Sequence, residues 1–205
     1  FLPIAGATNT RHYRNKLEFT ASNKRYLLPE EILVTNEETD AETEEPIINE
    51  GALGFHVPRI FDKTIDIFTC YLMDDINNLV RNKVRDFAKE HQMPFYDIRQ
   101  HTGWLRNIMI RYTTTGELML NVIINNEEES MRELLLDYIL EIVPTITSLY
   151  YTINPKWNDS IYDLEPVLYS GKAYVVERLR NKVSDQDFEF MISPKSFFQT
   201  NTQQA

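Results

Sequence analysis

Apolar and polar residues alternate along several short stretches of this chain, and a period of two is typical of β-strands with one buried face. A hairpin is expected over residues 105–125, where two apolar runs flank TTTGE and Gly116 lies at the turn. Residues 25–34 predict a further extended or short helical piece, which Pro29 interrupts. The remaining expected strands cover residues 11–21, 51–57, 64–70, 148–154, 172–179 and 187–193.

Two other stretches show apolar residues at steps of three and four, which is the spacing of one face of an α-helix. The first covers residues 73–92. Asp74 and Asp75 are expected in its first turn and Lys89 and His91 in its last, as the helix dipole favours. The second covers residues 127–144, with acidic residues at its start and a proline at its end. Strands and helices do not alternate regularly, so the order predicts an α+β fold with a mixed, mostly antiparallel sheet and two amphipathic helices.

Charge is spread unevenly along the chain. The 205 residues carry a net charge of −10, which weighs against nucleic-acid binding. However, residues 36–50 hold seven acidic residues and no basic one, and this run predicts a solvated acidic loop. Residues 1–35, by contrast, carry a net charge of +2. The overall acidity therefore does not exclude a basic surface elsewhere in the fold.

Recognisable chemical motifs are scarce. The sequence has no GxGxxG or Walker loop, no CxxC and no HExxH, and its histidines lack metal-ligand spacing. Arg11, Tyr13 and Lys16 lie close together in one predicted strand, and such residue types contact RNA phosphates and stack on bases. An ordinary exposed strand face is the alternative interpretation. Cys70 ends an apolar stretch and, taken alone, predicts a small buried side chain.

Four segments together say more than these single residues. They are YRNKLEFTAS (13–22), GFHVPRIFDKTIDIFTCYLM (54–73), LRNIMIRYTTTGELML (105–120) and ISPKSFFQTNTQQA (192–205). In this order and at this spacing they resemble the RNA (uracil-5-)-methyltransferase family, which makes 5-methyluridine in 23S rRNA or tRNA. The resemblance implies that residues 1–192 form the central α+β domain. It implies that residues 193–205 are the first residues of a truncated, Rossmann-like methyltransferase domain that uses S-adenosylmethionine (SAM).

The resemblance also implies roles for particular residues. Gln199 matches the glutamine that contacts SAM, and Phe198 matches an aromatic residue packed beside that site. Phe197 is expected to approach the RNA or its target base. Arg14 and Lys16 match the family's YRN[KR] strand and are expected to bind RNA.

Cys70 matches the fourth cysteine ligand of the [4Fe–4S] cluster found in many members. Such a cluster needs four ligands, and this chain supplies one cysteine, so the cluster could not assemble on this chain alone. Some members lack the cluster, so the buried-side-chain interpretation of Cys70 stays open. In the family's reaction an enzyme cysteine adds at C6 of uracil, and a base later removes the C5 proton. Both groups lie beyond Ala205 in the family, so we expect no catalytic residue in this chain and no activity from it alone.

The expected function is therefore SAM-dependent methylation of C5 of a uridine by a longer parent protein. The substrate is expected to be 23S rRNA rather than tRNA, because the helix–hairpin–helix region resembles the rRNA branch. We expect a cytoplasmic protein that binds RNA and no membrane, because no apolar run reaches the roughly 18 residues of a membrane span. The alternative is a non-catalytic α+β binding module that contacts a protein partner, which the acidic loop and the missing catalytic groups favour.

Overall fold

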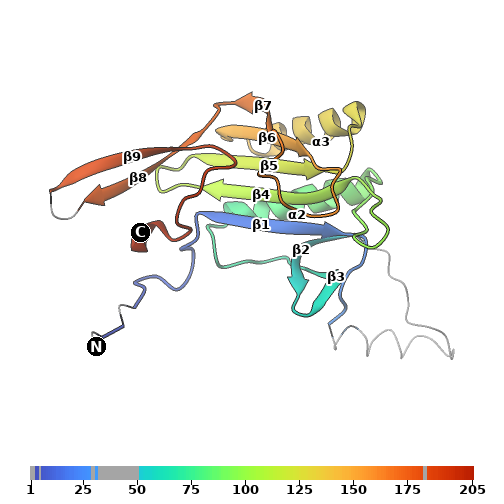
Figure 1. Ribbon diagram of the computed structural model, residues 1–205, viewed down its shortest axis with the longest axis horizontal. Coiled ribbons are helices and arrows are strands. Elements are labelled where there is room, and N and C mark those ends of the chain that lie inside the picture. Colours follow the sequence, from blue (N-terminus) through green and yellow to red (C-terminus); the bar gives the residue numbers. More distant parts are fainter. Residues whose placement is uncertain (1–2, 5, 29–30, 32–50, 182–183) are drawn as a thin grey trace.

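The computed structural model describes residues 3–4, 6–28, 31, 51–181 and 184–205. Within them, a seven-stranded sheet has the order β3-β2-β1-β4-β5-β6-β7 (Figure 1). Neighbouring strands are antiparallel except β5 and β6, which run parallel and are joined through a helix. The strands are β1 (Lys16–Ser22), β2 (Ala52–Val57), β3 (Ile60–Asp66), β4 (Leu105–Tyr112), β5 (Leu118–Ile124), β6 (Ser148–Ile153) and β7 (Val167–Gly171).

Three further parts complete the fold. Helices α2 (Ile76–Glu90) and α3 (Glu129–Ile142) lie together on one face of the sheet. Strands β8 (Val175–Asn181) and β9 (Gln186–Ile192) form a separate antiparallel hairpin that projects beyond the sheet (Figure 1). A single turn of 3-10 helix, Thr202–Gln204, follows. The predicted α+β class, the mostly antiparallel sheet and the two helices are confirmed.

The two faces of the sheet are buried by different parts of the chain. Phe19 of β1, Ile108 of β4 and Leu120 of β5 belong to the main core, together with Val84 of α2 and Leu136 of α3. Every residue of β5 is buried. Its side chains alternate between the main core on the helix side of the sheet and a second, smaller cluster on the opposite face. That cluster comprises Met109, Met119, Ile123, Tyr150, Val175 and Ile192. The face without helices is thus partly covered by β8, β9 and the residues after them.

The region around Cys70 differs from the prediction. The turn after β2 is limited to residues 58–59, where Arg59 takes a φ of 69°, so residues 60–63 already belong to β3, although the expected strand began only at residue 64. This two-residue turn pairs Val57 with Ile60 and starts β3 earlier than the apolar pattern suggests. The strand also ends earlier, at Asp66, and Cys70 lies in the loop that leads to α2.

Two smaller predictions were also wrong. Asp74 and Asp75 precede α2 and do not lie in its first turn, and Asp74 Oδ1 accepts the Ile76 amide at 3.2 Å. No strand was expected at β7, because it is a short, largely exposed edge strand with little apolar alternation. The acidic run 36–50 and most of residues 29–34 lie outside the described residues. In the described part of the chain, no helix combines the length and the apolar character needed to cross a bilayer.

Candidate nucleic-acid interface

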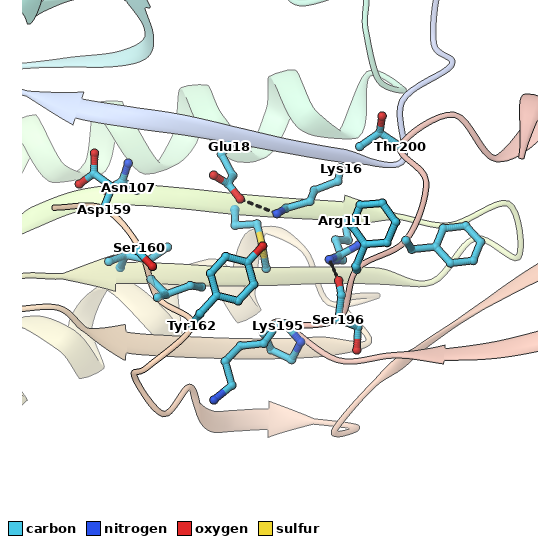
Figure 2. A pocket seen from close by; sticks show the side chains of 16 residues that line it. Lys16, Glu18, Asn107, Arg111, Asp159, Ser160, Tyr162, Lys195, Ser196 and Thr200 are labelled. Atoms are coloured by element: carbon cyan, nitrogen blue, oxygen red, sulfur yellow. Dashed lines mark hydrogen bonds and ion pairs between the residues drawn. The ribbon is translucent and has the colours of Figure 1, made fainter.

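A cavity of about 410 Å³ opens on the sheet face that carries no helix (Figure 2). Its floor consists of side chains from β1 and β4, and its walls come from residues 159–162 and 194–200. The lining residues are Lys16, Glu18, Asn107, Met109, Arg111, Ile123, Asp159, Ser160, Ile161, Tyr162, Pro194, Lys195, Ser196, Phe197, Phe198 and Thr200.

Strand geometry explains why charged residues form this floor. Side chains alternate across a strand, so Asn107, Met109 and Arg111 face the cavity while the residues between them face the helices. The antiparallel register of β1 and β4 then places Lys16 directly opposite Arg111. Figure 2 shows the two cationic side chains beside each other on the floor. Glu18 Oε1 lies 2.6 Å from Lys16 Nζ and offsets part of this positive charge.

Arg111 is the most unusual residue of the cavity. Its side chain is buried, with only 3% of the residue exposed, and one terminal nitrogen donates to the Ser196 carbonyl. Its Nε has no hydrogen-bond partner among the described residues. Burial lowers the pKa of Arg111, while the Glu18 carboxylate acts in the opposite direction. A buried and incompletely paired guanidinium at the floor of a cavity favours an anionic ligand, because its positive charge and its hydrogen-bond donors suit a phosphate or carboxylate group.

Aromatic side chains border the same cavity. Phe197 is 83% exposed and Tyr162 is 72% exposed, so both rings are available for stacking. Phe198 differs from its neighbour: it is half-buried, packs on the smaller core cluster and lies 5.6 Å from the ring of Phe190. The cavity therefore combines cations with exposed rings, which is the usual composition of a surface that binds single-stranded RNA.

The segment that carries Phe197 is anchored through a buried chain of hydrogen bonds. Asn15 Nδ2 donates to the Gln199 carbonyl at 2.8 Å and to Thr202 Oγ1 at 2.7 Å. Thr202 Oγ1 in turn donates to Glu177 Oε2 at 2.9 Å. The other Glu177 oxygen accepts the amides of Thr114 and Arg178, both at 3.0 Å. The residue just before β1, the β4–β5 turn and β8 thus hold residues 199–202 in one position.

The structure brings some of the predicted site residues together and separates others. Lys16, Phe197 and Phe198 line one cavity, whereas Arg14 and Gln199 are not among its described lining residues. The Arg14 amide donates to the Leu72 carbonyl at 2.8 Å. Gln199 is exposed, and its backbone carbonyl accepts a hydrogen bond from the side-chain amide of Asn15. The proposed contacts of these five residues with RNA or SAM stay predictions.

Cys70 lies elsewhere, on the helix side of the sheet. It is 6% exposed and packs in the main core, and its amide donates to Asn78 Oδ1 at 2.7 Å. Among the described residues, no three His, Cys, Asp or Glu side chains are grouped so that they could hold a metal ion. The sequence has no second cysteine, so the residues present do not fit a [4Fe–4S] cluster by themselves.

Several cavity residues were missed in the sequence. Arg111 could have been found, because it is a charged residue within the apolar run IMIRY, at the alternate positions that avoid the core. Asn107 lies on the same face of β4 and carries the same signal. Tyr162 gave no comparable signal, since it lies in a loop without periodicity.

Comparisons with known proteins agree with the resemblance. The chain is 45% identical to an uncharacterized RNA methyltransferase of Bacteroides thetaiotaomicron, over 99% of this chain and 42% of the relative. It is 43% identical to one of Porphyromonas gingivalis and 37% identical to one of Chlorobaculum tepidum, again over 99% of this chain and 42% and 40% of the relatives. The chain thus spans about two fifths of the length of these curated relatives. No family model matches it.

One solved structure shares the fold. It is the crystal structure of Pyrococcus abyssi tRNA (uracil-54, C5)-methyltransferase in complex with S-adenosyl-L-homocysteine. The match has a TM-score of 0.64 at 21% identity and covers 96% of this chain and 39% of that chain. At this identity, the likeness concerns the fold of the matched region.

Proposed function

This chain belongs, along nearly its whole length, to the family of the RNA methyltransferases that it matches, and from that premise we propose that its parent protein methylates C5 of a uridine in RNA. The contribution of this chain is to hold RNA in the cavity between β1, β4 and residues 194–200. The observation that carries the proposal is the buried, incompletely paired Arg111 beside the exposed ring of Phe197. Arg111 would bind a phosphate, and Phe197 would stack on a neighbouring base.

The other parts of the reaction belong to the rest of the parent protein. SAM would supply the methyl group, and we propose that residues 193–205 begin the domain that binds it. In this chain the exposed Gln199 amide fits such a contact, because Asn15 fixes its backbone and leaves the side chain at the surface. Phe198 would support that site by packing, and its ring also contacts Phe190. We propose no catalytic group here, so the chain alone should transfer no methyl group.

We propose 23S rRNA as the substrate, with tRNA as the competing outcome of the test. The solved neighbour is named for a tRNA, but it supports only the shared fold at its level of identity. A cytoplasmic location follows from either RNA, and the single cysteine fits a reducing compartment.

The reaction is tested in cells that lack the parent gene. Digested 23S rRNA and tRNA are analysed separately for 5-methyluridine by mass spectrometry, with and without the intact gene supplied on a plasmid. Loss from 23S rRNA that the intact gene restores supports the proposal, and loss from tRNA corrects the substrate. An unchanged 5-methyluridine content in both pools, in a strain without a second such gene, would refute the methyltransferase proposal.

The cavity is tested by Arg111→Met in the full-length protein. Removing one phosphate contact should weaken RNA binding and reduce the slope of log K against log salt by about 0.7. Arg111→Lys keeps the charge but loses the planar fork, so it should recover only part of the affinity. Arg132→Met is the matched control, because Arg132 is also an arginine with a mostly buried side chain but pairs with Glu127 and lies on α3, on the opposite face of the sheet. Equal RNA affinities for all these variants would show that the cavity does not bind RNA.

A further inference from the structure

We propose that the exposed ring of Trp157 forms a second stacking site for RNA, which takes an unpaired base next to the nucleotides in the cavity. This inference rests on the proposed RNA-binding function and extends it to a surface that no comparison assigns. It is carried by the exposure of Trp157, by the support beneath its ring and by its continuity with the cavity.

Trp157 is exposed to an unusual degree for its size. It is 74% exposed, whereas the other tryptophan, Trp104, is 2% exposed. One face of the Trp157 ring stacks on His101, with ring centroids 4.6 Å apart and an angle of 4° between the planes. Large aromatic side chains contribute most when buried, and exposed ones are enriched at contact surfaces. With one face covered by His101, the other face of the indole is available to a planar ligand.

The stack stands on a rigid support. The phenolic oxygen of Tyr96 lies 3.2 Å from Nδ1 of His101, and the buried guanidinium of Arg106 lies 4.1 Å above the Tyr96 ring. The same guanidinium donates to the carbonyls of Asn154 and Lys156, at 2.6 and 2.5 Å, in the loop that carries Trp157. One buried cation therefore fixes both the loop and the rings beneath the indole. A ring held in this way loses little conformational freedom when a base stacks on it.

The stacking site is continuous with the cavity. Asp159 lines the cavity two residues after Trp157, and Tyr162 lies on its wall. Tyr162 follows Trp157 by five residues, so their Cα atoms lie at most about 18 Å apart. The Asp159 carboxylate lies 2.9 Å from the Arg106 guanidinium, and the Asp163 carboxylate pairs with Lys156. These ion pairs reduce the repulsion of phosphates along the segment, so one short RNA strand would reach both sites.

RNA is the ligand that fits this arrangement best. A free indole face beside a cationic, aromatic-lined cavity accepts any base, because every base offers a π-face for stacking. A protein partner is the competing occupant and is treated as an outcome of the test.

The test uses the full-length protein and a fluorescein-labelled, single-stranded oligouridylate, with binding followed by anisotropy. Trp157→Ala should raise Kd about five- to a hundredfold, which corresponds to the loss of one stacked base. Trp157→Phe should restore most of the affinity, and Phe68→Ala, an exposed ring elsewhere, should leave it unchanged. The salt dependence should stay as in the wild type, because stacking displaces no counterion. RNA should also quench less of the tryptophan fluorescence in Trp157→Ala than in the wild type, since Trp104 of this chain is buried.

Different failures are distinguishable. Wild-type affinity in Trp157→Ala, together with weakened binding in Arg111→Met, would refute the stacking site and leave the proposed function intact. Failure of the wild type to bind RNA would refute both. If Trp157→Ala keeps its RNA affinity but loses a protein subunit from the purified complex, the surface is a protein contact and the inference is wrong.

Discussion

Asn15 connects the first strand to the segment that carries Phe197, and its truncation offers the sharpest test of how the site is held. Asn15→Ala removes two hydrogen bonds, to the Gln199 carbonyl and to Thr202 Oγ1. Each such bond contributes about 0.5–1.5 kcal/mol to stability, so the segment should be destabilised by about 1–3 kcal/mol. That loss corresponds to a rise of about five- to a hundredfold in local opening.

Hydrogen exchange read by mass spectrometry on the full-length protein measures this opening. The Asn15 amide donates to the Thr200 carbonyl at 2.8 Å, and the Tyr112 amide donates to the Asn15 carbonyl at 3.0 Å. Both amides should therefore exchange faster in Asn15→Ala, while amides in the middle of α2 should exchange as in the wild type. The affinity for RNA should fall as well, because the position of Phe197 depends on this anchor.

Asn9→Ala is the matched control for this prediction. Asn9 also reaches the C-terminal segment, with Nδ2 donating to Gln203 Oε1 at 3.0 Å, but both groups are exposed. An exposed hydrogen bond competes with water, so its loss should change local opening by less than about threefold. Equal exchange rates in Asn15→Ala and the wild type would refute the view that Asn15 anchors the segment.

Two further predictions concern other buried carboxylates. Glu177→Gln places an amide donor against the groups that now donate to this fully buried carboxylate, so hydrogen exchange of the β8 amides should become about tenfold faster or more. Glu189→Gln, at an exposed carboxylate, is the control and should leave this exchange unchanged. Equal exchange rates in Glu177→Gln and the wild type would contradict the prediction. Burial alone would raise the pKa of Asp97, but hydrogen bonds from the Asn23 side chain and the Gln100 amide outweigh burial, so the pKa lies below its usual value. Asp97 should therefore stabilise the loop that carries His101 fully above about pH 4 and lose this effect as the pH falls through its lowered pKa. Trp157 fluorescence followed through acid titration should show this step in the wild type and not in Asp97→Asn, and a step in both would refute the assignment.

The elements that were predicted best are those whose signal is local. The hairpin over residues 105–125 and the two amphipathic helices were identified because each shows a complete apolar period within its own sequence. β7 was missed because an exposed edge strand needs little apolar alternation. Cys70 was placed in a strand because its neighbours are apolar, although the register of β2 and β3 ends that strand at Asp66.

The candidate site also contains residues that the sequence indicated and residues that only the structure revealed. The resemblance carried by the sequence pointed to Lys16, Phe197 and Phe198, and the cavity contains all three. The resemblance assigned no contact to Asn15. The structure shows that the Asn15 side chain does not line the cavity but holds the segment that carries Phe197. Arg111 belonged to a recognised hairpin, but its burial and its incomplete pairing depend on a segment from the other end of the chain.

For the strands that were predicted correctly, the sequence by itself determined which side a residue faces, because the period of two follows from backbone geometry alone. It also determined the family, through short segments kept in order and spacing. Only the tertiary structure decided which strands lie next to each other and which side chains they bring together. The pairing of Lys16 with Arg111 comes from the antiparallel register of β1 and β4, and the aromatic wall comes from residues 194–200 folding back over them. Such contacts join residues far apart in the chain and depend on the balance of the whole core, which no local pattern contains.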